Sequence, residues 1–333
     1  MGGDTSDITA KGNKFNGGVK VAKTAFIFPG QGSQTPGMAT ALASESKSAR
    51  DILAEVDDIL DFNLSGLMAE GPADELQLTQ NAQPALFASS LATLRTIEQV
   101  TGKPINQLCD FVAGHSLGEY SALCAAQSIE VASTASLLRL RGEAMQKAVP
   151  VGEGAMAALL GADIPLADAV IEAASFTGLV EIANDNAAGQ IVVSGETKAV
   201  EAAMEIARDK GLRRVISLPV SAPFHCAMMA PAADVMAEAL GSTIMRSAQV
   251  PVVCNITAST ESSAEQLRAN LIAQVTGRVR WRETMEFMVA IGVTRFLELG
   301  TGKVLSGLAK RTAPEAEILS VDTLEDIQKA FDL

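Results

Sequence analysis

The chain has 333 residues, a formal net charge of -13 and a composition that is 48% hydrophobic. A chain of this length can bury roughly three quarters of the surface that it exposes when unfolded, so it can form a large enzyme core without disulfides or metal sites. The acidic balance argues against a general nucleic-acid-binding role, because such proteins need a basic surface.

The cysteine spacing and the first 20 residues indicate the cellular compartment in which we expect the protein. The four cysteines, Cys109, Cys124, Cys226 and Cys254, form no C-x-x-C pair, which argues against a disulfide framework and a zinc site. No run of about 18 apolar residues exists, so we expect neither a membrane span nor a membrane partner. Residues 1–20 are polar and Gly-rich and lack an apolar signal core. We expect a disordered extension there, and a cytoplasmic protein without metal or cofactor.

The first part of the chain predicts strands that alternate with helices. Residues 24–28 form a short apolar run that ends at a Pro-Gly pair, which is typical of a buried strand entering a tight loop. Helical spacing follows at 41–60, 84–100 and 121–148, and an apolar strand at 111–113 lies between the last two. This alternation predicts a mostly parallel sheet.

A second pattern begins near residue 154. Its elements predict the order β-α-β-β-α-β, with strands at 155–160, 180–182, 190–193 and 214–218, helices at 165–174 and 198–210, and Asn184-Asp185-Asn186 between the two central strands. This order matches a ferredoxin-like unit. Strands at 250–256 and 294–299 and helices at 263–275 and 281–290 follow it.

These patterns predict an α/β fold with two domains. Residues 21–150 and 220–333 would form a large catalytic domain with a parallel sheet, and residues 151–219 a ferredoxin-like small domain inserted into it. Ligands commonly bind in the cleft between two such domains.

The sharpest chemical signal is Gly114-His115-Ser116-Leu117-Gly118, which follows an apolar strand and precedes a helix. A G-x-S-x-G turn lifts the serine hydroxyl above the sheet, and the helix that follows offers N–H groups to a developing oxyanion. A bare match to this motif is as often a plain loop. The strand-turn-helix context favours a nucleophilic serine at Ser116.

The sequence contains only two histidines that could serve as the base. His115 is the immediate neighbour of Ser116, so its ring should point away from the hydroxyl and line the pocket or brace the turn. His225 follows the inserted domain and could face Ser116 across the cleft. An isolated histidine is more often a core residue, but the scarcity of alternatives favours His225. No acidic residue stands out to orient it, so a backbone carbonyl or an amide is expected to do so.

Two further segments bear on the site. The loop Gly30-Gln31-Gly32-Ser33-Gln34 lacks the third glycine of a dinucleotide fingerprint and the lysine of a P-loop, so a backbone donor to an oxyanion is the better interpretation. Arg141 interrupts an apolar helical stretch. An arginine on a helix is usually solvated, but one that faces the cleft suits a carboxylate in a bidentate manner.

Together these residues give a resemblance to the malonyl-CoA:acyl carrier protein transacylases of fatty-acid synthesis, over residues 24–311. The motifs are Phe28-Pro29-Gly30-Gln31-Gly32-Ser33-Gln34, Gln83-Pro84-Ala85, the run from Gly114 to Ala122, Arg141-Gly142 with Met145, Asn184-Asp185-Asn186 with Gly189-Gln190, and Pro223-Phe224-His225. The resemblance implies an α/β-hydrolase-like core, a ferredoxin-like insert, and malonyl transfer from coenzyme A to the phosphopantetheine thiol of acyl carrier protein through a malonyl-serine.

The resemblance also implies roles for individual residues. Ser116 would be the nucleophile and His225 its base; the N–H groups of Gln31 and Leu117 would hold the oxyanion; Arg141 would pair with the malonyl carboxylate; His115, Gln83, Met145, Phe224, Asn184 and Asn186 would line the substrate site; and Asn255 or the main chain at Arg280 would steady His225.

Two residues depart from the pattern or refine it. Arg280 stands where relatives are expected to carry glutamine, a silent change if only the backbone carbonyl acts. Phe224 precedes the histidine, as in acyltransferase domains that prefer malonyl over branched acyl groups, although one methylene changes discrimination by only ~1 to 3 kcal/mol.

The carrier partner poses an electrostatic problem, because an acid-rich carrier and this acidic chain should repel each other. We expect a local basic surface to dock it, formed by Arg278, Arg280, Arg282, Lys310 and Arg311. Scattered solubilising charge is an equally good explanation of these residues.

Other functions remain open at this point. A serine hydrolase or thioesterase shares G-x-S-x-G, an acyltransferase for another acyl-CoA shares the whole site, and a carrier-binding module could keep a vestigial one. Arg141 argues against the hydrolase, and the intact Ser116 and His225 argue against the module. We expect a monomer.

Overall fold

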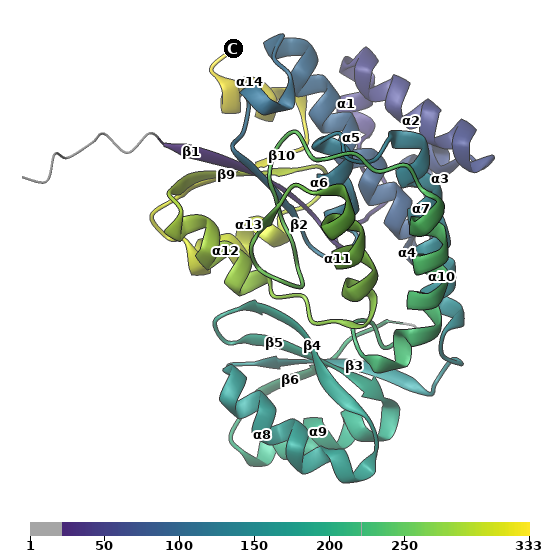
Figure 1. The fold of residues 1–333 in the computed structure, drawn as a ribbon, viewed down its shortest axis with the longest axis vertical. Coiled ribbons are helices and arrows are strands. Elements are labelled where there is room, and N and C mark those ends of the chain that lie inside the picture. The colour runs from purple at the N-terminus through teal and green to yellow at the C-terminus, as the bar shows by residue number, and fades with distance from the viewer. Residues whose placement is uncertain (1–21, 221) are drawn as a thin grey trace, which may run out of the picture.

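The structure is a computed structural model that describes residues 22–220 and 222–333, so the disordered extension expected at residues 1–20 lies outside the described residues. Figure 1 shows a larger α/β part and a smaller part with its own sheet. The strands are β1 (Lys23–Phe28), β2 (Phe111–Gly114), β3 (Gly154–Leu160), β4 (Val180–Ala187), β5 (Gln190–Glu196), β6 (Arg214–Ser217), β7 (Val252–Val253), β8 (Thr260–Glu261), β9 (Val293–Leu299) and β10 (Glu317–Val321).

Helices make up most of the remaining chain. The α-helices are α1 (Thr40–Glu45), α2 (Lys47–Leu60), α3 (Leu64–Glu70), α4 (Ala73–Gln77), α5 (Thr79–Thr101), α6 (Gly118–Ala125), α7 (Val131–Lys147), α8 (Ile164–Ala174), α9 (Thr197–Asp209), α10 (Ala230–Ser242), α11 (Ala264–Thr276), α12 (Trp281–Ala290), α13 (Val304–Thr312) and α14 (Leu324–Phe331). Short 3₁₀ turns lie at η1 (Ile105–Gln107), η2 (Ser175–Thr177) and η3 (Ala227–Met229).

The larger sheet positions the site. Its strand order is β10-β9-β1-β2-β7-β8, and every neighbouring pair except β7 with β8 is parallel. In the register of β1 with β2, Phe28 pairs with Gly114, so both strands end at the same edge. The loops that follow, Pro29-Gly30-Gln31 and His115-Ser116, therefore meet there, where ligands bind in open α/β sheets.

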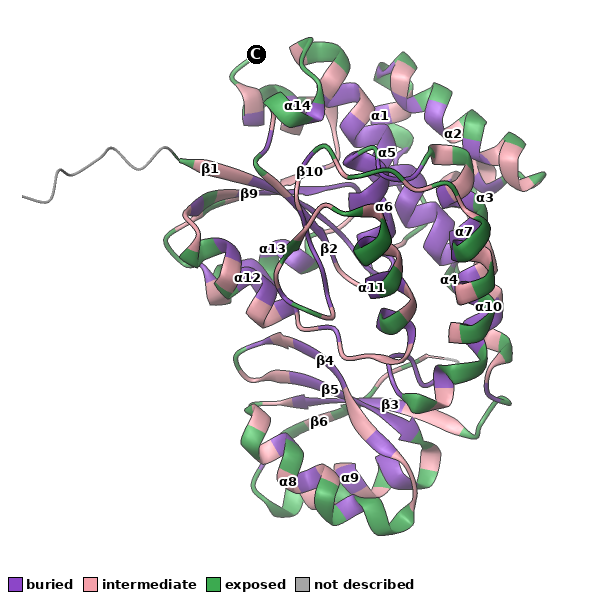
Figure 2. Cartoon of the chain, viewed as in Figure 1, coloured by how far each residue is buried: buried purple, intermediate pink, exposed green. Residues whose placement is uncertain are grey.

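Apolar residues on the strands and helices bury this sheet. Figure 2 shows β1, β2 and β9 buried along most of their length. The helix α5 is buried on nearly all sides between α2 and α7, and buried polar side chains such as Ser90 and Thr93 donate to backbone carbonyls.

The smaller sheet has the strand order β4-β5-β3-β6 and is antiparallel throughout. The helices α8 and α9 cover its face away from the larger part, with a separate apolar core between helices and sheet (Figure 1). The expectation of an α/β fold with a parallel-containing sheet and a second, separate sheet is confirmed.

Several predicted elements differ from the structure. The helix expected at 121–148 is two helices, α6 and α7, because Gln127 takes a left-handed conformation with φ 59° between them. The strand expected at 250–256 is only Val252–Val253 long. The triplet Asn184-Asp185-Asn186 lies within β4, not between two strands. Among helices at residues 22–220 and 222–333, none combines the length and apolarity that a membrane crossing needs.

Candidate active site

The turn between β2 and α6 holds Ser116 in a left-handed conformation with φ 53°. Both flanking glycines are required by close approach of the backbone. A Cβ on Gly114 would lie 1.9 Å from the Gly118 carbonyl, and one on Gly118 would lie 2.3 Å from the Phe28 oxygen. This packing fixes the tight turn and presents the Ser116 side chain at the start of α6.

Ser116 and His225 meet as expected from the sequence. Ser116 Oγ lies 2.8 Å from His225 Nε2, and His225 is 4% exposed. On its other side, His225 Nδ1 lies 2.9 Å from the backbone oxygen of Gln274 on α11. A carbonyl only accepts, so Nδ1 carries the proton and Nε2 is free to accept one from the Ser116 hydroxyl.

The prediction that Asn255 or the main chain at Arg280 steadies His225 is wrong. Asn255 binds the turn instead, because its Oδ1 accepts from Ser116 N at 2.7 Å and its Nδ2 donates to Gly114 O at 2.7 Å. Arg280 precedes α12 and donates to Glu283 and to Ile256 O. The expected carbonyl belongs to Gln274, six residues earlier.

Burial keeps the His225 imidazole neutral. Loss of solvation, followed by the positive charge of Arg141, lowers the pKa of His225 to about 3, while the Gln274 carbonyl opposes the shift. A neutral imidazole is the form that can take a proton from Ser116.

Arg141 lies beside the nucleophile and is 1% exposed. Its Nη1 donates to Gln83 Oε1 at 2.9 Å, and its Nη2 to Gln274 Oε1 at 2.9 Å and to Ser116 Oγ at 3.2 Å. Its Nε is buried without a hydrogen-bond partner, and no carboxylate of the described chain lies within ion-pair distance. Burial accordingly lowers the pKa of Arg141. The Arg141 guanidinium thus touches no carboxylate of the described chain, and the charge of Glu119 reaches it only across Gln274.

Two residues that sequence reasoning did not select connect these groups. Gln274 Nε2 donates to Glu119 Oε2 at 2.7 Å and to Ser116 O at 3.0 Å. Glu119 is 1% exposed, and the same Oε2 accepts from Asn255 N at 3.0 Å. Burial raises the pKa of Glu119, and its bonds to Gln274 and Asn255 oppose the shift. Glu119 thus joins the segments of Asn255 and Gln274, which both support the serine turn. Its position three residues after Ser116 is the feature of the sequence that could have indicated this role.

A cavity of about 430 Å³ opens over the nucleophile. Sequence-predicted residues that line it are Gln31, Gln83, His115, Ser116, Leu117, Arg141, Met145, Asn184, Asn186, Phe224 and His225. Met156 and Val192 add apolar surface from the small domain. The cavity therefore lies between the two parts of the molecule, as the sequence predicts for the cleft.

His115 points away from the serine hydroxyl. Its Nε2 lies 2.8 Å from Asn186 Oδ1, and its ring centroid lies 5.6 Å from that of Trp281. Burial lowers the pKa of His115. A neutral His115 that donates from Nε2 links the serine turn to the small domain.

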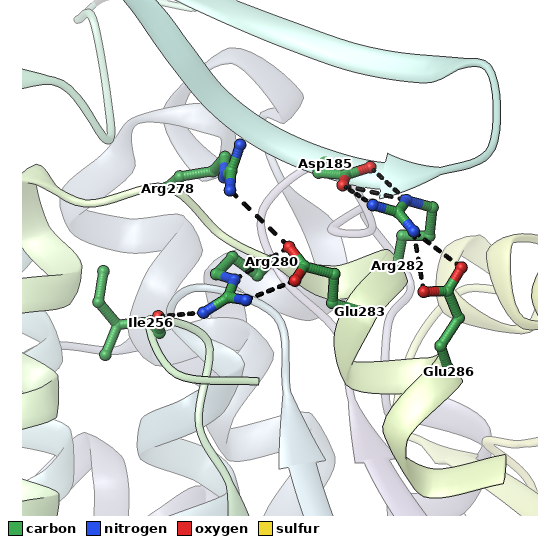
Figure 3. Close-up of polar contacts among 7 residues, drawn as sticks. All are labelled: Asp185, Ile256, Arg278, Arg280, Arg282, Glu283 and Glu286. Carbon is green, nitrogen blue, oxygen red and sulfur yellow. Dashed lines mark hydrogen bonds and ion pairs between the residues drawn. The ribbon is translucent and has the colours of Figure 1, made fainter. Parts of the chain in front are cut away.

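The expected basic surface is largely neutralised by neighbouring acids. Figure 3 shows Arg278 and Arg280 paired with Glu283, and Arg282 paired with Asp185 and Glu286. Lys310 and Arg311, on the last turn of α13, are exposed, and Arg311 donates to Gln190 Oε1 at 3.0 Å. In the described part of the chain, no cluster of His, Cys, Asp or Glu could hold a metal ion.

Comparisons with known proteins agree with this geometry. The acyl transferase domain family matches residues 25–326. The malonyl CoA-acyl carrier protein transacylase of Bacillus subtilis (strain 168) is 43% identical over 312 residues, which are 93% of this chain and 97% of that protein.

Two solved structures are also similar. The acyl-carrier-protein-S-malonyltransferase of Bartonella henselae has a TM-score of 0.91 and 51% identity, with 93% of this chain and 98% of that chain covered. A malonyl-transacylase in complex with its type II PKS acyl-carrier protein has a TM-score of 0.89 and 40% identity, with 93% of this chain and 99% of that chain covered.

Proposed function

The chain belongs to the acyl transferase domain family, and we propose that it moves a malonyl group from malonyl-CoA to the phosphopantetheine thiol of acyl carrier protein. One observation carries the proposal: Arg141, a buried cation that touches no carboxylate, donates to the same Ser116 oxygen that lies within reach of His225. A nucleophile, its base and a receptor for a free carboxylate thus share one cavity. A malonyl thioester offers a carbonyl to the first two and a carboxylate to the third.

In the first half-reaction, Ser116 Oγ attacks the thioester carbonyl while its proton passes to His225 Nε2. The tetrahedral intermediate then collapses, the carbon-sulfur bond breaks, and His225 returns the proton to the departing sulfur of coenzyme A. The products are malonyl-Ser116 and free coenzyme A.

In the second half-reaction, the carrier's thiol gives its proton to His225 and attacks the ester carbonyl. The bond to Ser116 Oγ breaks, the serine oxygen takes the proton back, and malonyl leaves on the carrier. Each half-reaction leaves His225 neutral, which suits an imidazole whose pKa burial has lowered.

The oxyanion would be held by the backbone N–H groups of Gln31 and Leu117. Both residues line the cavity, and Leu117 directly precedes α6, whose N-terminus favours negative charge. One such donor contributes about 3 kcal/mol of transition-state stabilisation.

Selection of malonyl would rest on Arg141 and on the shape of the cavity. A buried guanidinium that lacks a partner anion gains much from a substrate carboxylate, because the ion pair forms away from water. Phe224, which is 9% exposed, and Met145, whose Sδ lies 3.8 Å from Gln83 Nε2, limit the space around the acyl carbon. Gln83 in turn positions Arg141.

The carrier would dock on the surface where basic side chains form no ion pair with an acid of the described chain. Lys310 and Arg311 are better candidates than the three arginines near α12, whose charges are matched by acids. Charge reversal at Lys310 and Arg311 should raise the KM for the carrier severalfold and leave the KM for malonyl-CoA unchanged. A change below twofold in the carrier KM would remove these residues from the docking surface.

The finer fold and the setting are proposals as well. The antiparallel order β4-β5-β3-β6 with two helices on one face supports a ferredoxin-like insert, and the parallel pairs around β1 support an α/β-hydrolase-like core. We also propose that the protein acts as a monomer in the cytoplasm.

The decisive experiment is covalent labelling with malonyl-CoA, followed by intact mass measurement with and without a thiol acceptor. The wild-type chain should gain one malonyl group and pass it to the acceptor, and Ser116→Ala should gain none. Release of free malonate in place of transfer would assign a hydrolase. A label retained by Ser116→Ala would overturn Ser116 as the nucleophile.

A further inference from the structure

The small domain meets the large one along β4. The amide of Asp185 donates to Val279 O at 2.9 Å, and the amide of Val279 donates to Ala183 O at 2.8 Å. A short stretch of β4 is thus hydrogen-bonded to the segment that leads into α12, and the pairing of Asn184 with Val279 is parallel. This contact joins residues nearly a hundred positions apart in the sequence.

The same stretch of β4 is irregular inside its own sheet. Its register with β5 shifts between Ile182 and Asn184 and again between Asp185 and Ala187. Bulges of this kind re-aim side chains beside active sites and leave a strand less firmly specified by its ladder. Asn184 and Asn186, which line the cavity, lie in this stretch, so groups outside the small sheet must fix their direction.

Arg282 on α12 supplies the strongest such contact. Figure 3 shows its guanidinium facing the carboxylate of Asp185, whose side chain is 1% exposed. Arg282 Nη2 lies 2.7 Å from Asp185 Oδ2, and Nε lies 3.1 and 3.0 Å from Oδ1 and Oδ2. A planar fork on a buried carboxylate fixes orientation as well as distance.

Asn184 and Asn186 flank Asp185 and both line the cavity, so an anchored Asp185 fixes the backbone from which these two side chains project. Asn186 Oδ1 then receives the hydrogen bond from His115 Nε2, next to the nucleophile. A continuous set of contacts therefore leads from Arg282 through β4 to the residue beside Ser116.

We propose that Arg282 and Asp185 are positioning residues. Their ion pair, the interdomain ion pair, holds Asn184 and Asn186 over the cavity. Its contribution is to substrate binding, because Ser116, His225 and Arg141 all belong to the large domain and keep their mutual contacts without it. The predicted effect on malonyl-CoA rests on the proposed function, whereas the effect on His115 does not.

The test compares Arg282→Met and Asp185→Asn with the wild-type chain in the acylation half-reaction. Both variants should lower kcat/KM for malonyl-CoA roughly tenfold, through KM, with kcat nearly unchanged. The matched control is Glu286→Gln, which removes the other ion pair of Arg282, an exposed contact, and leaves Asp185 bound. This control should acylate like the wild type.

A second readout does not depend on activity. The sequence has only two histidines, so a ¹³C-labelled sample gives two resolved imidazole titrations by NMR. Loss of the interdomain ion pair should let water reach His115 and raise its pKa toward 6.5, while the titration of His225 stays as in the wild type.

Three results bear on the proposal in different ways. If Arg282→Met keeps the wild-type KM and the wild-type His115 titration, the proposal is wrong. A fall in kcat with an unchanged KM would also overturn it, because the pair would then act on the reacting groups. If the His115 titration shifts as expected but even the wild-type chain is not malonylated, the positioning role stands and the proposed function fails.

Discussion

The wall of the cleft that carries Ser116 is held mainly by buried side chains around the larger sheet, whereas the opposite wall depends on contacts between the two parts of the molecule. Asn255, Gln274 and Glu119 fix the serine turn through buried hydrogen bonds. Asn184 and Asn186 lie on an irregular strand whose anchor is partly exposed. The difference teaches that the contacts that orient Ser116 and His225 lie within the larger part, so they do not depend on the ion pair that anchors β4.

The largest expected effect comes from removing the general base of the Ser116 wall. His225→Ala removes the only imidazole within reach of Ser116 Oγ, so the acylation rate should fall by roughly a thousandfold or more. Rapid-quench labelling with malonyl-CoA measures this rate. A loss below tenfold would contradict the assignment of His225 as base.

The next effect tests whether Arg141 binds the substrate carboxylate or acts on the reacting groups. Arg141→Ala should lower kcat/KM for malonyl-CoA roughly a hundredfold, because a buried charge-assisted contact to the substrate carboxylate is lost. Acetyl-CoA lacks that carboxylate, so acylation by acetyl-CoA should change far less. Competition between the two thioesters checks the prediction. An equal loss of kcat/KM for both would show that Arg141 does not bind the malonyl carboxylate.

A smaller effect separates the side chain of Gln274 from its carbonyl. Gln274→Ala keeps the backbone bond to His225 but removes the bonds to Arg141, Glu119 and the Ser116 carbonyl, so kcat/KM for malonyl-CoA should fall roughly tenfold. Acylation by acetyl-CoA should fall less. If both thioesters lose a thousandfold, the side chain is needed to hold His225 itself.

The smallest effect concerns stability in acid. The pKa of His225 is about 3 in the folded chain against an ordinary 6.5, so the unfolded chain binds the extra proton first as the pH falls. Stability is therefore lost progressively from pH 6.5 downward. Between pH 6.5 and pH 5 the Tm of His225→Asn should fall by a few degrees less than that of the wild type, as measured by calorimetry; parallel Tm curves would contradict the lowered pKa.

The two walls also differ in how far the sequence predicts them. The serine turn follows from local signals, since Gly114 and Gly118 are required by backbone contacts and Ser116 stands between them. The role of Gln274 does not, because any residue has a carbonyl and only the tertiary fold brings this one to His225. The sequence predicts that Asn255 steadies His225, but its side chain binds the serine turn instead.

The same distinction holds for the fold. The alternating patterns predict the β-α-β-β-α-β order, but no glycine or proline in the sequence indicates the helix break at Gln127. The pairing of β4 with the segment at Val279 and its bulges depend on contacts distant in sequence, which periodicity does not reveal. Of the acids that pair with the three arginines near α12, Glu283 and Glu286 lie close in the sequence, whereas Asp185 reaches Arg282 only through the tertiary fold.

The place where the chain crosses between the two domains has a further consequence. A Cβ on Gly154, at the start of β3, would lie 2.4 Å from the ring of Pro223, two residues before His225, so the outgoing and returning segments touch. Adjacent ends are what allow one domain to be transplanted into another without disturbing the host. The segment from β3 to β6 thus leaves and re-enters the larger part at neighbouring points, as expected of an insertion.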